Sequence, residues 1–239
     1  MKLSNKVGFT IIETMLFLAI TGLLVMGVLI GTGNSINTQR YRDSITSLQA
    51  FFQQQYSDVS NVSNDNAGNV KCYSNNAVPR GQSDCVILGR LITTNADSSG
   101  LIFEDVIGQI PSGLPTPSDD ISALAQYNIT ALPSAGSVYN VEWGGVLVTP
   151  GSNNHAAMFS ILILRSPLSG IVRTFIDNAA IVNNLTSFIK RINPSPLLQS
   201  EKVCINSNGL FAGGEMAVLI NAGATSASGV ETLGNNSGC

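Results

Sequence analysis

The sequence predicts an α+β protein in which one long N-terminal helix packs along an antiparallel β-sheet head. Two patterns lead to this prediction. Residues 9–62 have the pattern of one long helix, apolar on all sides in its first half and amphipathic in its second. From residue 70 onward, short apolar or alternating segments are separated by clusters of Gly, Pro, Asn and Ser, which is typical of strands and turns.

The first half of the predicted helix is long enough to cross a membrane. Residues 9–32 contain a single charged residue, Glu13, and the next charge along the chain is Arg40. About 20 apolar residues cross the hydrocarbon layer of a bilayer. Hydrophobic residues make up 44% of the chain and charged residues only 11%, and much of that imbalance comes from this segment. We therefore expect a membrane-anchored chain.

Two ordinary interpretations of this segment leave Glu13 unexplained. A secretory signal peptide cut near Gly31 and Gly33 would have an apolar core of roughly 7–15 residues, and this one is longer. A plain signal anchor accounts for the length and for Lys2 and Lys6 on the cytoplasmic side. A carboxylate inside an apolar span is costly without a partner, so Glu13 marks a function.

The segment around Glu13 resembles a known sequence signature, which indicates what that function is. The run Gly8-Phe9-Thr10-Ile11-Ile12-Glu13, after a short leader with two lysines, resembles the type IV prepilin signature. The resemblance implies that a prepilin peptidase cuts between Gly8 and Phe9 and methylates the new amine of Phe9. It also implies that Glu13 neutralises the N-terminal amine of a neighbouring subunit during filament assembly.

The resemblance also implies an organisation and a location. The expected parts are a leader (1–8), a transmembrane and filament-core helix (9–35), the amphipathic half of the same spine helix (36–62) and a β-rich, pilin-like head (63–239). We expect a single-pass protein of the inner (cytoplasmic) membrane with its head outside the cytoplasm, later found in a pilus or pseudopilus. The implied partners are prepilin peptidase, other pilin or pseudopilin subunits and the inner-membrane assembly platform.

The same family comparison narrows the kind of subunit. Many major pilins carry a helix-kinking proline in the apolar half, whereas residues 9–35 contain none. The head is also large for a major pilin. We therefore expect a structural subunit that is a minor pilin or a type II secretion pseudopilin. The alternative is a filament-tip adhesin or DNA-binding module delivered by a pilin-like N-terminus, with ligand sites in loops 108–120 and 223–238.

The spacing of apolar residues predicts the second half of the helix and the strands of the head. Apolar residues recur every three or four positions and predict a face that packs on the head: Tyr41, Ile45, Leu48, Phe52, Tyr56 and Val59, widened by Phe51. The predicted strands are 85–93, 101–106, 138–148, 157–164, 171–176, 202–206 and 217–221, with a hairpin turn at 166–170. Short helices are predicted at 183–191 and, capped by residues 119–120, through residue 127. Trp143 is expected in the core.

The cysteines favour disulfides over a metal site. Cys72, Cys85, Cys204 and Cys239 form an even set without a CxxC pair. In an exported chain this predicts two disulfides, since structural zinc sites usually have close ligand pairs. The spacing suggests Cys72 with Cys85 and Cys204 with Cys239, and many pilins close a C-terminal loop in this way. The crossed pairings remain open from sequence.

The remaining polar residues do not predict an enzyme or a cofactor. The single histidine, His155, follows two asparagines and is expected in a solvated loop. The acidic pairs 104–105 and 119–120 lack EF-hand spacing, so a loop or a helix cap is favoured over a calcium site. The net charge of −3 does not favour nucleic acid as the main partner, because phosphate binding needs a concentrated basic face.

Overall fold

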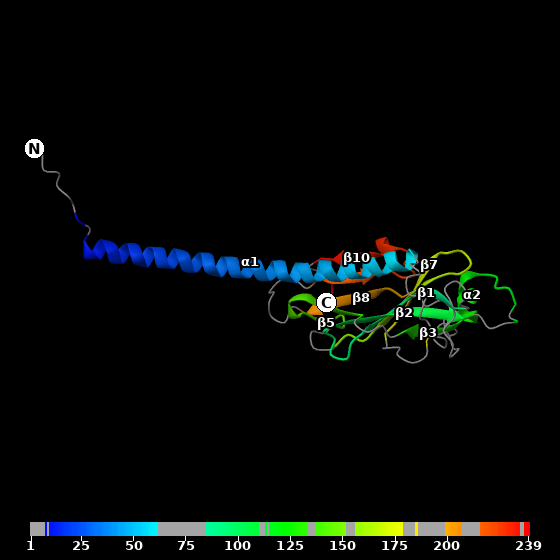
Figure 1. The fold of residues 1–239 in the computed structure, drawn as a ribbon. Helices are drawn as coiled ribbons and strands as arrows, with labels where there is room; N and C mark the ends of the chain where they lie inside the picture. Colours follow the sequence, from blue (N-terminus) through cyan, green and yellow to red (C-terminus); the bar gives the residue numbers. More distant parts are fainter. Residues whose placement is uncertain are drawn as a thin grey trace, which may run out of the picture.

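The computed structural model describes residues 8, 10–61, 85–109, 113, 115–132, 137–151, 156–178, 185, 199–206, 216–234 and 237–239. They form one long N-terminal helix that extends far beyond a β-rich head (Figure 1). The α+β prediction is confirmed in this form. The elements are α1 (Ile11–Ser60), β1 (Cys85–Thr94), β2 (Gly100–Gln109), α2 (Asp120–Gln126), β3 (Asn128–Leu132), β4 (Val138–Asn140), η2 (Glu142–Gly144), β5 (Val146–Val148), β6 (Ser160–Arg165), β7 (Val172–Asp177), β8 (Glu201–Asn206), β9 (Ala217–Ile220), η3 (Ala227–Gly229) and β10 (Val230–Leu233).

The helix α1 runs without a break along its whole length, as its sequence pattern predicts. At its C-terminal end the backbone N–H of Asn61 donates to the carbonyl of Ser57 at 2.9 Å. In its second half, the seven residues of the predicted apolar stripe are all buried: Tyr41, Ile45, Leu48, Phe51, Phe52, Tyr56 and Val59. The prediction that this face packs on the head is confirmed.

The strands of the described residues form two antiparallel sheets. The larger sheet has the order β3-β2-β1-β6-β7, with β4 also paired to β2, and the smaller has the order β10-β9-β8-β5. Both sheets contribute to one core with α1, which contains Ile161 and Ile163 of β6 together with Val203 of β8 and Val218 of β9. The buried half of α1 therefore covers a core that both sheets share.

The strand β6 of the larger sheet is buried on both faces, which explains its continuous apolar run. Ile161 and Ile163 face the core under α1, whereas Leu162 and Leu164 face a second core that includes Leu124 of α2. Successive side chains of a strand point to opposite faces, so a strand covered on both sides needs apolar residues at every position.

The predicted strand 138–148 is wrong in its middle. The chain leaves the larger sheet after β4, turns through η2, and enters the smaller sheet as β5. Trp143 and Gly144 have positive φ angles of 58° and 72°, which no strand permits. Trp143 is 51% exposed, so its expected place in the core is also wrong.

Other head predictions are confirmed or fall outside the described residues. The predicted strands 85–93, 101–106, 157–164, 171–176, 202–206 and 217–221 correspond to β1, β2, β6, β7, β8 and β9 with shifted ends. The strands β3 and β10 were not predicted. The predicted helix 183–191 lies almost entirely outside the described residues, and His155 and Cys72 lie outside them too.

Candidate functional site

The first half of α1 has no packing partner among the described residues. Its large apolar side chains, from Ile11 to Ile36, are 48% to 78% exposed. Its most apolar stretch has a mean hydropathy of 2.3 and is entirely unburied, so the helix is long and apolar enough to cross a membrane, by length and composition. These residues cover about 39 Å at 1.5 Å per residue, more than the roughly 30 Å of a hydrocarbon layer. Exposed apolar surface on this scale marks a contact with membrane or protein.

Glu13 forms a capping box with Thr10 at the start of this exposed half. The Thr10 hydroxyl accepts from the Glu13 backbone N–H at 3.3 Å, and Oε2 of Glu13 accepts from the Thr10 backbone N–H at 3.3 Å. The box satisfies two backbone donors that the first turn of a helix leaves free. Glu13 therefore has a local role in its own chain. Gly8 is exposed, and Phe9 lies outside the described residues.

Two buried tyrosines fix the other half of α1 to the head. The Tyr41 hydroxyl accepts from the Met216 backbone N–H at 2.9 Å and donates to the Ile205 carbonyl at 3.1 Å, which ties α1 to the smaller sheet. The Tyr56 hydroxyl lies 2.7 Å from Oγ1 of Thr174 in β7. Because Thr174 gives its own hydrogen to the Ala224 carbonyl, Tyr56 must be the donor.

The environment of Tyr56 agrees with its role as a donor. Burial raises the pKa of Tyr56 to about 12, while the hydrogen bond with Thr174 acts in the opposite direction. The hydroxyl therefore stays protonated over the physiological range. Tyr41 bonds to the smaller sheet and Tyr56 bonds to the larger sheet. The exposed half of α1 therefore continues a helix segment that is fixed to the head.

Arg90 of β1 joins the end of α1 to the larger sheet. Its guanidinium donates to Oε1 of Gln55 at 2.6 Å and lies 3.3 Å from the carboxylate of Asp58, both on α1. It also pairs with Asp105 of β2 at 3.1 Å and lies over the Phe103 ring, 5.4 Å from its centroid. The Arg90 guanidinium thus contacts three polar side chains, two on α1 and one on β2.

Three of the four carboxylates in the acidic pairs of the sequence are engaged in structural contacts. Asp105 pairs with Arg90, and Asp119 caps α2 by accepting from the backbone N–H groups of Ile121 and Ser122. The Ser122 N–H is the main cause that lowers the pKa of Asp119. Asp120 accepts from Ser166 and pairs with Arg173. The helix cap predicted at 119–120 is confirmed, and the described residues contain no group of three potential metal ligands.

The C-terminus is bound to the smaller sheet by a disulfide between Cys204 of β8 and Cys239. The Lys202 ammonium donates to the Ser237 carbonyl beside it. This pairing, which the sequence left open, is confirmed. Only the backbone of Cys85 is described, as the first residue of β1, so the second predicted disulfide lies outside the described residues.

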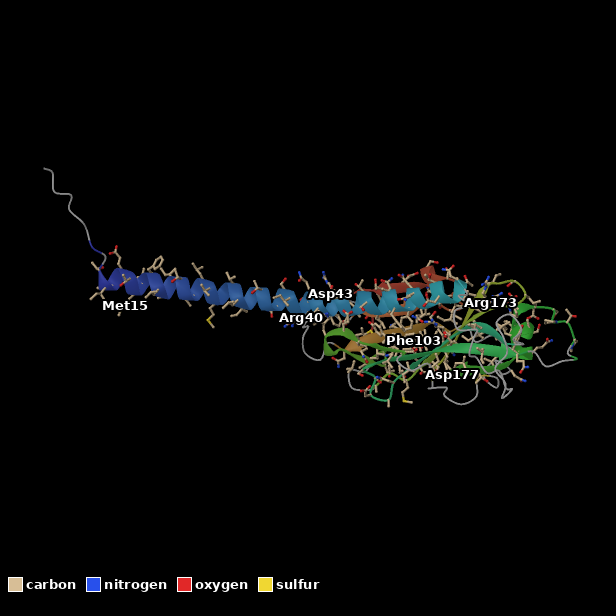
Figure 2. All side chains as sticks on the ribbon, in the orientation of Figure 1. Met15, Arg40, Asp43, Phe103, Arg173 and Asp177 are labelled. Carbon is tan, nitrogen blue, oxygen red and sulfur yellow. A yellow bond between two sulfur atoms is a disulfide. The ribbon has the colours of Figure 1, made fainter. Side chains whose placement is uncertain are left out.

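One feature near the base of the head was missed from the sequence. The Arg40 guanidinium lies over the Trp143 ring, 4.9 Å from its centroid. Arg40 lies where α1 meets the head (Figure 2). The signal that could have located Trp143 outside the core is the Gly144-Gly145 pair directly after it, because two glycines in a strand pattern indicate a turn.

No protein-family model, no curated protein and no solved structure matches this chain.

Proposed function

We propose that this chain is a structural subunit, a minor pilin or pseudopilin, of a type IV pilus-like filament. In this proposal a prepilin peptidase removes residues 1–8 and methylates Phe9. The exposed half of α1 anchors the subunit in the membrane and then packs with equivalent helices in the filament. A structural role also agrees with the use of Asp105, Asp119 and Asp120 in contacts that hold the head together.

The observation that carries the proposal is the division of α1 at Tyr41. Before this residue the helix is exposed, and it is apolar from Ile11 to about Gly31, whereas after it the same helix is built into the core of the head. A membrane anchor alone would not need a rigid connection to the folded domain. A filament subunit does, because force and position must pass from the helical core of the filament to its heads.

Glu13 supports the same proposal through its electrostatics. A carboxylate at the start of an apolar helix cannot be well hydrated in a membrane or in a filament core. The N-terminal ammonium created by cleavage before Phe9 meets the same penalty. If Glu13 of one subunit pairs with the amine of the next, both charges are compensated, whereas losing one leaves the other buried and unpaired.

The capping box must be separated from this assembly role in any test. Glu13→Gln is suited to the purpose, because glutamine also forms capping boxes but carries no charge. Thr10→Ala is the matched variant, since it removes the hydroxyl that accepts from the Glu13 N–H and keeps the carboxylate. Both variants should reach the membrane at the level of the parent protein.

The measurement is the amount of each variant in filaments purified from cells that assemble them. We expect Glu13→Gln to lower incorporation roughly tenfold or more, since the cost of an uncompensated buried charge is about 3–5 kcal/mol. Thr10→Ala should assemble nearly normally. Normal incorporation of Glu13→Gln would mean that Glu13 is only a helix cap, and the assembly role would be wrong.

Processing is tested separately by mass spectrometry of the mature N-terminus. The proposal requires a chain that begins with N-methylated Phe9. A chain that retains Met1 contradicts prepilin processing, and a chain that begins at Asn34 would show that the apolar segment is a secretory signal peptide.

A further inference from the structure

Trp143, in the turn between β4 and β5, has an unfavourable backbone conformation and an exposed side chain. Trp143 has φ 58° and ψ 24°, the left-handed region that residues with a Cβ avoid, and its indole is 51% exposed. Backbone strain and an exposed indole both oppose the stability of an isolated head. Such outliers persist where a function requires them.

The turn itself is firmly held. Val141 and Leu147, on its two sides, are buried. Gly145 packs so closely that a Cβ there would lie 2.8 Å from Ile205 and 2.9 Å from Val141. The carboxylate of Glu142 accepts a hydrogen bond from the Ser47 hydroxyl of α1 at 3.0 Å. The turn is therefore fixed against both the smaller sheet and the helix, and the direction of Trp143 is set by the fold.

Arg40 is the charged residue that lies beside this indole, 4.9 Å from its centroid. It is also the first charge after Glu13 in the sequence. Arg42 follows and is exposed, and Asp43 comes next, farther from the apolar segment. The nearest charges to the apolar segment on the head side are thus basic, while the Glu142 carboxylate is engaged with Ser47 farther along α1.

The unbroken helix determines how far this pair lies from a membrane. If Glu13 marks the inner edge of the hydrocarbon layer, about 30 Å of helix places the outer edge near Gly33. Arg40 then lies about 10 Å beyond that edge, and the headgroup layer on each side is about 5–8 Å thick. Because α1 is unbroken and Tyr41 is already buried in the head, the base of the head stays within reach of the surface, and docking depends on the tilt and rotation of the whole subunit.

We propose that Trp143 and Arg40 form a docking surface for the anionic headgroups of the membrane leaflet that faces the head. Tryptophan settles at the membrane interface, where its apolar ring and its N–H are both accommodated. Arginine binds phosphate through its planar fork and can extend its side chain toward the surface. Docking fixes the tilt and rotation of the head before assembly. This inference rests on the membrane-inserted state of the proposed function.

Trp143 is the single tryptophan of the chain, so its fluorescence reports on this surface alone. The experiment uses the full chain in vesicles of phosphatidylcholine and phosphatidylglycerol that carry a spin label on the headgroup. The matched control combines Trp143→Phe with Leu168→Trp. Leu168 is 51% exposed, like Trp143, but belongs to the turn between β6 and β7, beside α2 at the opposite end of the head (Figure 1).

We expect the headgroup label to quench Trp143 severalfold more strongly than the tryptophan of the control. Arg40→Gln should lower the ratio of docked to undocked heads about fivefold in anionic vesicles, the effect of one basic residue near such a surface. In vesicles of phosphatidylcholine alone, the parent protein and Arg40→Gln should differ less in the ratio of docked to undocked heads.

Two results would overturn the proposal. Equal, weak quenching of both tryptophans by the headgroup label would place Trp143 in water. Protection of Trp143 that grows with the protein-to-lipid ratio, without quenching by lipid, would instead identify a contact between subunits. Neither result depends on filament assembly, so a failure here is distinguishable from a failure of the Glu13 experiment.

Discussion

Replacing Arg90 by methionine tests how the end of α1 is fixed to the head. Methionine keeps an apolar side chain of similar length beside Phe103 but removes the charge and all the donors. Three partners then lose a hydrogen bond or an ion pair: Gln55 and Asp58 on α1, and Asp105 on β2. Figure 2 shows Phe103 in this part of the head, below the buried half of α1.

The expected cost follows from the exposure of each partner. Gln55 is 2% exposed, and a buried carbonyl that loses its donor costs about 1–3 kcal/mol. The pair with Asp105, whose side chain is 22% exposed, is partly screened, and the pair with Asp58, at 38%, contributes about 0–1 kcal/mol. The total is about 2–4 kcal/mol of unfolding free energy.

The assay is unfolding of the full chain in detergent micelles, followed by near-ultraviolet circular dichroism of its tyrosines, which reports tertiary packing. Arg173→Met is the control, because Arg173 is 40% exposed and Asp120 keeps its hydrogen bond with Ser166. We expect its cost to stay within about 1 kcal/mol. A second variant that adds Gln55→Leu to Arg90→Met should recover part of the loss, since removing both partners leaves no unpaired buried group.

The reasoning is refuted if Arg90→Met unfolds within about 0.5 kcal/mol of the parent protein, the range of ordinary surface substitutions. It is also refuted if adding Gln55→Leu to Arg90→Met recovers nothing, because the buried carbonyl of Gln55 would then not be the main cost.

Three further predictions concern the head. Tyr41→Phe removes the hydroxyl that bridges Met216 and Ile205, so the midpoint of thermal unfolding should fall, by an amount that corresponds to about 1–3 kcal/mol. An unchanged midpoint would contradict this. Replacing both Cys204 and Cys239 by alanine should cost about 3–4 kcal/mol by the loop-entropy estimate and expose the C-terminus to limited proteolysis; unaltered protease resistance would mean that other contacts hold the tail. Burial raises the pKa of Glu201 to about 7, so the folded state favours its protonated form. The contribution of Glu201 to stability should therefore be greatest below its ordinary pKa and be lost as the pH rises through 7. Glu201→Gln should remove this part of the slope, with a gain of about 1 kcal/mol at pH 8 after allowance for solvent screening; an unchanged slope would assign the pH dependence to another group.

The sequence predicted the features that depend on local periodicity. The stripe from Tyr41 to Val59 repeats with the period of a helix, and every predicted member is buried. The run Ile161–Leu164 is apolar at each position because β6 is covered on both faces. In both cases the environment of a residue follows from its nearest neighbours along the chain.

Features set by distant parts of the chain were not predictable in this way. The chain changes sheets within 138–148 because β5 pairs with β8, more than fifty residues later, and sequence alone does not reveal that partner. The strand β10 has a mixed pattern, Val-Glu-Thr-Leu, and forms because β9 offers an open edge. Trp143 is expected in the core because it lies in a strand pattern, although the following glycines indicate a turn.

The geometry of Glu13 suggests how one carboxylate can serve both its own helix and a neighbour. Both hydrogen bonds from Thr10 reach the same atom, Oε2, and among the described residues Oε1 accepts none. A carboxylate offers about four acceptor positions, so in the proposed filament Oε1 would be free to take the ammonium of another subunit while the cap stays intact. Glutamine keeps the cap but presents only one carbonyl oxygen, already used by Thr10, and an amide that repels the ammonium. On this reasoning the proposed filament would need glutamate at position 13 for its second oxygen, whereas the helix cap needs only the first, which glutamine also supplies.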